Sequence, residues 1–361
     1  MKLQYKKIAV KIGSNVLTKG DGTLDVARMA QLVDQIATLR KLGVEVILIS
    51  SGAVAAGRTE LNIDKKMDAV SSRQLWSAVG QVKLINRYSY FFREYGLSCA
   101  QVLTTKENFK DRRHYLNMKN CITTLLENGV IPIVNENDTI SVTELMFTDN
   151  DELSGLIASM MKTEALVILS NINGIYTGHP DDEGTRVIPK IHAETSDLSE
   201  YISTNKSEFG RGGMITKCNI ARKIAEEGID VHIANGKRDN ILPDLLDKKV
   251  EVEHSHFVAA EKQSSNVKKW LAHSYSFAKG VISINEGAEA ALQSQKASSL
   301  LMVGVTEVEG YFEKGDIVKI YNSKGVQLGI GKTKYDSTKA QKYLGKEKGK
   351  VLVHYDYLYL F

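Results

Sequence analysis

The sequence is poor in cysteine and proline. Its 361 residues include 3 Cys and 4 Pro. The cysteines, Cys99, Cys121 and Cys218, are odd in number and far apart, so they fit neither a disulfide framework nor a paired zinc site. We therefore expect a reducing, cytoplasmic setting in which each cysteine acts as a small buried apolar side chain.

Long apolar runs and a strong charge of either sign are also absent. No stretch approaches the ~18 apolar residues of a membrane-spanning helix, and Lys11 interrupts the apolar part of the basic start. The 47 Lys and Arg nearly balance the 43 Asp and Glu, for a net charge of +4. A domain that coats nucleic acid would carry a stronger basic bias. We expect neither a membrane protein nor an exported one.

The sequence does contain the pattern of a folded α/β protein, with 43% hydrophobic and 25% charged residues. Over residues 1–245, short β-branched runs alternate with longer amphipathic stretches, which predicts an open, mostly parallel sheet between helices. The predicted strands are 8–12, 45–50, 99–104, 130–135, 165–170 and 230–234. The predicted helices are 26–42, 73–95, 117–128, 153–161 and 214–227, the first of them capped by Asp25.

The pattern changes near residue 275, where short strands punctuated by glycine replace the alternation. This part predicts a small β-barrel-like domain with one helix over 286–295. It contains 12 Lys, no Arg and 9 Asp or Glu. We predict a first domain over 1–260, a linker over 261–276 and a second domain over 277–361.

Polar or small residues follow several of the predicted strands. Lys11 lies inside an apolar strand pattern and precedes Gly13 and Ser14, which allow a tight turn with exposed amides. A lysine there can reach a phosphate, although a water-facing lysine on an edge strand gives the same pattern. Residues 50–53 (SSGA) also end a strand, and their amides can approach an anion. Ligands of open α/β sheets gather where such strands end.

Two further segments combine carboxylates and amides. Residues 135–138 (NEND) follow a fully apolar strand, and residues 148–152 (TDNDE) open a predicted helix. Such side chains suit the ammonium and carboxylate groups of an amino acid. A solvated turn with Asx hydrogen bonds also explains the first segment, and helix capping explains part of the second.

A glycine-rich segment, residues 210–217 (GRGGMITK), leads into the last predicted helix of the first domain. Its amides and the helix dipole favour phosphate, although the spacing is neither a Walker motif nor a dinucleotide fingerprint. The segments together favour phosphoryl transfer to a small polar acceptor. A carboxylate acceptor is already ionised and needs no general base, so lysines and Mg²⁺ would supply the charge neutralisation. His254 and His256 match no zinc pattern, and we expect a structural or solvent-facing role for them.

The motifs resemble those of the glutamate 5-kinase family, amino acid kinases with a C-terminal PUA domain, over nearly the whole chain. In the first domain the resemblance rests on VKIGSNVLT (10–18), SSGAVAAGR (50–58), AVGQ (78–81), VIPIVNEND (130–138), DNDELSGLIA (149–158) and GGMITK (212–217). In the second domain it rests on INEGAEAAL (284–292), SSLLMVGV (298–305) and GYFEKGD (310–316).

The resemblance implies an amino-acid-kinase fold and ATP-dependent phosphorylation of the γ-carboxylate of L-glutamate, the first step of proline biosynthesis. By position, it implies that Lys11 and Lys217 contact the phosphates and that Asp151 orients both lysines. The implied glutamate-binding residues are Ser51, Asn135, Asp138 and Asn150. The implied ATP-binding residues are Lys11, Ser170, Asn171, Arg211, Gly212, Gly213, Met214, Ile215, Thr216 and Lys217, and no residue is expected to ligate a metal.

The resemblance also implies ATP and Mg²⁺ as cofactors, proline as a feedback inhibitor, a homo-oligomer and no membrane contact. Two alternatives stay open. One is a kinase of another small carboxylate, of the acetylglutamate or aspartate type, and the other is a PUA-type RNA-binding protein. The lack of Arg in the tail weighs against RNA, because nucleic-acid recognition relies on that residue.

Overall fold

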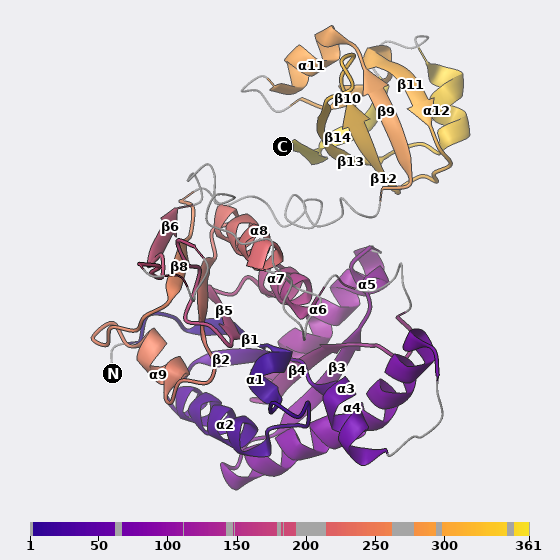
Figure 1. The fold of residues 1–361 in the computed structure, drawn as a ribbon. Helices are drawn as coiled ribbons and strands as arrows, with labels where there is room; N and C mark the ends of the chain where they lie inside the picture. Colours follow the sequence, from indigo (N-terminus) through magenta and orange to yellow (C-terminus); the bar gives the residue numbers. More distant parts are fainter. Residues whose placement is uncertain are drawn as a thin grey trace. The chain divides into compact units, whose positions relative to one another are not determined.

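The chain divides into two compact units, Met1–Gln263 and Ser264–Phe361, which Figure 1 traces along the sequence. This computed structural model describes residues 3–61, 67–110, 112–141, 147, 149–178, 182, 184–192, 214–261, 278–293, 298–344 and 350–360.

The first unit is built on an eight-stranded sheet of order β3-β4-β2-β1-β5-β7-β8-β6. All neighbouring strands are parallel except the antiparallel pair β7 and β8. The six predicted strands are confirmed with each end within one residue, and the short β6 and β8 are additional. The strands are β1 (Lys7–Ile12), β2 (Glu45–Ser50), β3 (Cys99–Thr104), β4 (Ile131–Glu136), β5 (Ala165–Ser170), β6 (Lys190–His192), β7 (Asp230–Asn235) and β8 (Ser255–Val258).

Helices cover both faces of this sheet, with α2, α3, α4 and α9 on one side and α6, α7 and α8 on the other (Figure 1). The α/β prediction is therefore confirmed. Among the described residues, no helix is both long enough and apolar enough to cross a membrane. The helices are α1 (Ser14–Leu17), α2 (Val26–Lys41), α3 (Ala53–Glu60), α4 (Ala69–Glu94), α5 (Glu107–Lys110), α6 (Arg112–Glu127), α7 (Asn150–Met161), α8 (Met214–Glu226) and α9 (Ile241–Leu246).

Capping side chains decide where several helices begin. Asp25 accepts a hydrogen bond from a first-turn amide of α2, as predicted. Asp68 caps α4 in the same way, so that helix begins at Ala69, four residues before the predicted start. Asp149 caps α7, which begins at Asn150 and not at residue 153. Two site residues of α7 therefore belong to its first turn.

Two glycines let α3 and α4 pack backbone to backbone. A Cβ atom at Gly80 would lie 1.7 Å from the Ala53 carbonyl oxygen, and one at Gly57 would lie 1.9 Å from the Trp76 carbonyl oxygen. No side chain fits at either position without moving a helix. The contact holds the start of α3, which follows β2, against the first half of α4.

The second unit is a six-stranded sheet of order β10-β14-β13-β12-β9-β11 that curls around a core of its own, which includes the fully buried Phe312 (Figure 1). Its strands are β9 (Gly280–Ile284), β10 (Leu300–Leu301), β11 (Val305–Glu309), β12 (Ile317–Tyr321), β13 (Gln327–Thr333) and β14 (Val351–Leu360). The β-rich prediction is confirmed. The expectation of one helix is wrong, because α12 (Ser337–Tyr343), capped by Asp336, accompanies the predicted α11 (Glu286–Gln293).

The three cysteines lie in different environments. Cys218 is buried, Cys99 is partly buried and Cys121 is exposed. The expectation of a buried side chain is therefore wrong for Cys121, which faces solvent from α6.

Replacing Gly80 with alanine tests the close contact between α3 and α4. The added methyl group must separate the two backbones, so Gly80→Ala should lower the free energy of unfolding by about 2–3 kcal/mol or more. Thermal or urea denaturation followed by circular dichroism measures the change.

Gly20→Ala is the matched control in the same unit, because nothing lies within 4 Å of a Cβ atom added there. It should change the free energy of unfolding by less than about 0.5 kcal/mol. Equal stability of the two variants would contradict the packing argument.

Candidate active site

The polar segments converge at one edge of the sheet. Strands β1, β2, β4, β5 and β7 are parallel, so their carboxyl ends open on the same side. The sheet grows from β1 through β2 and β4 in one direction and through β5 and β7 in the other. Such a switch point between β1 and β5 is where open α/β sheets bind ligands.

A buried carboxylate bridges two lysines at this edge. Lys11 Nζ lies 2.5 Å from Asp151 Oδ1, and Lys217 Nζ lies 2.7 Å from Asp151 Oδ2. Asp151 has no exposed surface, and the two lysine side chains are only 7% and 12% exposed. Lys11 therefore does not lie on an edge strand facing water, because β1 is paired on both sides.

The two lysines control the ionisation of Asp151. Burial alone would raise the pKa of this carboxyl group, but the charges and hydrogen bonds of Lys11 and Lys217 outweigh it and lower the pKa. Asp151 in turn raises the pKa of Lys217 against the effect of burial. The lowered pKa keeps Asp151 ionised near neutral pH. Two lysines and one aspartate give the trio a formal net charge of +1.

Backbone approach shapes the two loops beside the trio. A Cβ atom at Gly13, which follows β1, would lie 3.0 Å from the Leu169 carbonyl oxygen, so a side chain there would crowd β5. Gly52, which follows β2, has φ +99°, a left-handed conformation that favours glycine. Glycine at position 13 lets the loop after β1 pack closely against β5, and glycine at position 52 allows the left-handed turn after β2.

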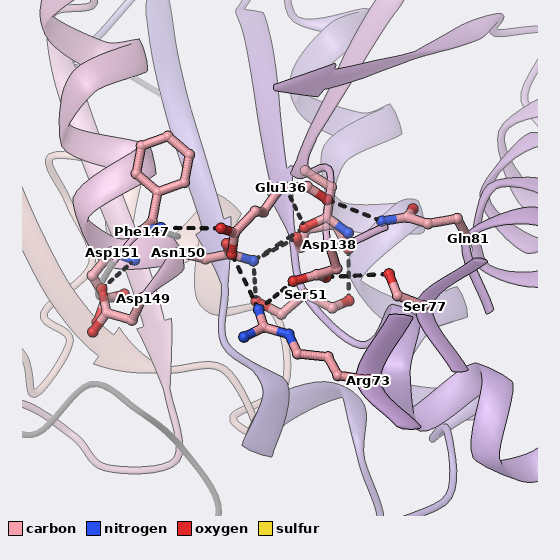
Figure 2. A network of polar contacts seen from close by, with 12 residues as sticks. Ser51, Arg73, Ser77, Gln81, Glu136, Asp138, Phe147, Asp149, Asn150 and Asp151 are labelled. Atoms are coloured by element: carbon pink, nitrogen blue, oxygen red, sulfur yellow. Dashed lines mark hydrogen bonds and ion pairs between the residues drawn. The ribbon is translucent and has the colours of Figure 1, made fainter. Parts of the chain in front are cut away.

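The middle of the site is a cluster of amides and a hydroxyl group. The Asn150 side-chain amide donates toward Ser51 Oγ at 2.9 Å, the Ser50 carbonyl at 3.0 Å and Asn135 Oδ1 at 3.2 Å. Three of the predicted glutamate-binding residues, from three different segments, thus meet at one nitrogen. Figure 2 shows Asn150 beside Asp149 and Asp151 at the start of α7.

The far end of the site is carboxylate-rich, with Glu136 and Asp138 both buried. Arg73 of α4 forms ion pairs with both, at 3.2 Å to Glu136 and in closer contact with Asp138 (Figure 2). Burial, followed by the charge of Asp138, raises the pKa of Glu136 to about 7, while Arg73 opposes that rise. Glu136 also accepts a hydrogen bond from the Phe147 amide at 3.0 Å.

One face of α4 meets this carboxylate-rich end, and the sequence-based interpretation missed it. Arg73, Ser77 and Gln81 recur every four residues, and each contacts Glu136 or Asp138 at the carboxyl end of β4 (Figure 2). Ser77 Oγ donates to Asp138 Oδ2 at 3.3 Å. The regular spacing of polar residues was the available signal, but a solvent-facing stripe has the same spacing. Only the fold distinguishes the two.

The residues predicted to bind ATP are described in part. Ser170 ends β5 and is buried, and Asn171 follows it on the surface. The residues Met214, Ile215, Thr216 and Lys217 form the first turn of α8. Arg211, Gly212 and Gly213 lie outside the described residues. Strand β5 pairs with β7, and α8 packs against β7, so Ser170 and the first turn of α8 lie on the β7 side of the switch point.

Two family models match the chain. The model described as the amino acid kinase family matches residues 6–235, and the model of the PUA domain matches residues 280–355. Carbamate kinase from Giardia lamblia, solved with AMP-PNP bound, covers 71% of this chain and 99% of its own, with a TM-score of 0.50 at 16% identity. That similarity concerns the fold alone.

Full-length relatives are more similar. A glutamate 5-kinase of Bacteroides thetaiotaomicron is 63% identical over 360 residues and covers 100% of both chains. A glutamate 5-kinase of Chlorobaculum tepidum is 47% identical and covers 99% of this chain and 98% of its own. Identity of this extent over both domains means that the chain belongs to the glutamate 5-kinases of the amino acid kinase family.

Proposed function

We propose that this chain transfers the terminal phosphoryl group of ATP to the γ-carboxylate of L-glutamate, giving L-glutamyl 5-phosphate, the first step of proline biosynthesis. The observation that carries this proposal is the buried trio of Lys11, Asp151 and Lys217 at the switch point of the sheet. The relatives that match the whole chain, named glutamate 5-kinases, support the same reaction.

The order of the polar groups supports glutamate as the acceptor. The cationic trio, the cluster around Asn150 and the carboxylate-rich end are continuous, because Asn150 adjoins Asp151 and Asn135 adjoins Glu136. If the γ-carboxylate of glutamate lies at the trio, its ammonium group lies toward Asp138. Acetylglutamate lacks that ammonium group, and aspartate is one methylene shorter, so neither alternative acceptor satisfies both ends.

The reaction needs positioning and charge neutralisation more than proton transfer. The acceptor carboxylate is ionised near neutral pH, so it attacks the phosphorus without a general base. Lys11 and Lys217 bring two anions together and stabilise the negative charge on the transferred group. Asp151 holds both ammonium groups in place without cancelling their combined charge.

Mg²⁺ fits this arrangement as a companion of ATP. Among the described residues, no group of three or more His, Cys, Asp or Glu could hold a metal ion by itself. Mg²⁺ in kinase sites, however, takes substrate phosphates and only one or two carboxylates. The buried Asp149 Oδ2 has no hydrogen-bond partner in the part of the chain that is described, so it is a suitable ligand. When bound, the ion would neutralise phosphate charge.

We place ATP on the side of Ser170, Asn171 and the segment from Arg211 to Lys217. Proline carries the same α-carboxylate and a cationic nitrogen, so we propose that it competes with glutamate at Asn150 and Asp138.

A cytoplasmic homo-oligomer is also part of this proposal. A role of the PUA domain in RNA binding is the weaker alternative, and a filter-binding titration against salt would reveal it as a steep negative slope.

The acceptor preference is the direct test of the reaction. With ATP and Mg²⁺, hydroxylamine should trap an acyl phosphate from L-glutamate, with much lower turnover on L-aspartate and N-acetyl-L-glutamate. The hydroxamate assay measures all three. Equal turnover on aspartate, or none on glutamate, would contradict the proposal.

The lysines should govern the rate. Lys11→Ala and Lys217→Ala should each lower kcat by about 10²-fold or more, because each removes charge stabilisation that grows in the transition state. Lys41→Ala, an exposed change in the last turn of α2, is the control and should leave kcat unchanged. A loss confined to KM in the two site variants would mean that the lysines only bind substrate.

Asp138 should govern affinity. Asp138→Ala should raise KM for glutamate more than it lowers kcat, because the group that Asp138 binds does not react. The same variant should weaken inhibition by proline, measured at several glutamate concentrations. Inhibition that does not fall as glutamate rises would place the proline site elsewhere.

A further inference from the structure

Arg73 is the cation at the carboxylate-rich end of the site. Its side chain is 20% exposed, whereas those of Glu136 and Asp138 are only 4% and 9% exposed. The guanidinium group reaches these two carboxylates from α4, the helix that packs against the start of α3. The arginine is therefore the most solvent-accessible member of a buried charge cluster.

The charges of the cluster do not suit an anionic substrate unless Arg73 takes part. Glu136 and Asp138 carry two negative charges when ionised, and L-glutamate brings two carboxylates and one ammonium group. Asp138 can accept the ammonium group, but the α-carboxylate would then face two buried carboxylates. A cation is needed beside it, because an unpaired buried charge is strongly destabilising.

The guanidinium group has the right shape for that partner. Its planar fork donates two parallel hydrogen bonds to a carboxylate, which a single ammonium group cannot do. Glu136 is held by the Phe147 amide as well as by Arg73, so it keeps one fixed partner when the arginine turns. Ser77 similarly keeps a hydrogen bond to Asp138 Oδ2. The cluster can thus exchange one partner without leaving either carboxylate bare.

We propose that Arg73 is a substrate-binding residue that exchanges its ion pair with Asp138 for one with the α-carboxylate of the substrate. This inference rests on the proposed function for the identity of the substrate. The ammonium group of L-glutamate then takes the place of the guanidinium group on Asp138. One internal ion pair becomes two ion pairs with the zwitterion, and the site selects amino acids that carry both groups.

L-Isoglutamine separates this role from a merely structural one. It keeps the ammonium group and the γ-carboxylate of glutamate but carries a neutral amide in place of the α-carboxylate. Arg73→Gln should raise KM for L-glutamate by about 10-fold or more, because a charged hydrogen-bonded pair is lost. It should change kcat by less than about 3-fold. It should not raise the inhibition constant of L-isoglutamine, because that ligand no longer has to displace a guanidinium group from Asp138. Arg73→Lys should give an intermediate KM, since it keeps the charge and loses the fork.

The control is Arg93→Gln, an exposed change at the far end of α4, which should alter none of these constants. If Arg73→Gln raised the constants of glutamate and isoglutamine together, or changed neither, the proposal would be overturned. A fall in kcat alone would overturn it as well. Wild-type affinity for isoglutamine equal to that for glutamate would do so without any variant, even if Arg73→Gln failed to fold.

Calorimetry keeps the two proposals separate. If the wild-type protein binds L-glutamate but does not phosphorylate it, the proposed function fails while the role of Arg73 can still be measured as a loss of affinity in Arg73→Gln. If phosphorylation occurs and that affinity does not change, only the role of Arg73 fails.

Discussion

The ion-paired trio of Lys11, Asp151 and Lys217 is the interaction around which the site is built. A carboxylate with no exposed surface is stable only when it is paired, and Asp151 is paired twice. This requirement ties β1, the start of α7 and the first turn of α8 together at the edge of the sheet. The same pairing leaves one net positive charge where a phosphoryl group would be transferred. In the proposed reaction, chemistry would therefore depend on the same three side chains that stabilise this edge of the sheet.

A second constraint is the close approach of α3 and α4. Because Gly57 and Gly80 allow backbone contact, α4 lies near enough to the carboxyl end of β4 for one polar face to reach Glu136 and Asp138. The glycines do no chemistry themselves. They set the position of Arg73 and Ser77, and so connect packing in one helical layer to the charge balance at the far end of the site.

The division of the site into a cationic end and a carboxylate-rich end gives it a direction. In the proposed reaction, the lysines neutralise charge and the residues around Asp138 recognise the amino-acid group. The Asn150 amide joins the two ends by reaching three segments at once. The position of each group within this order accounts for the different effects expected on rate and on affinity.

The sequence by itself determined the local elements and the list of chemically active segments. Apolar β-branched runs located the six long strands of the first unit, and the 3.6-residue apolar repeat located five of its helices, because both patterns are local properties. The motifs that resemble the glutamate 5-kinase family singled out Lys11, Asp138, Asn150, Asp151 and Lys217, because a motif is also a pattern of neighbouring residues. Tertiary structure alone decided which of them touch: it placed Lys11 on a central strand, exposed Cys121, and turned Arg73 and Ser77 toward the site. Those outcomes depend on contacts between residues far apart in the chain, which no local pattern encodes.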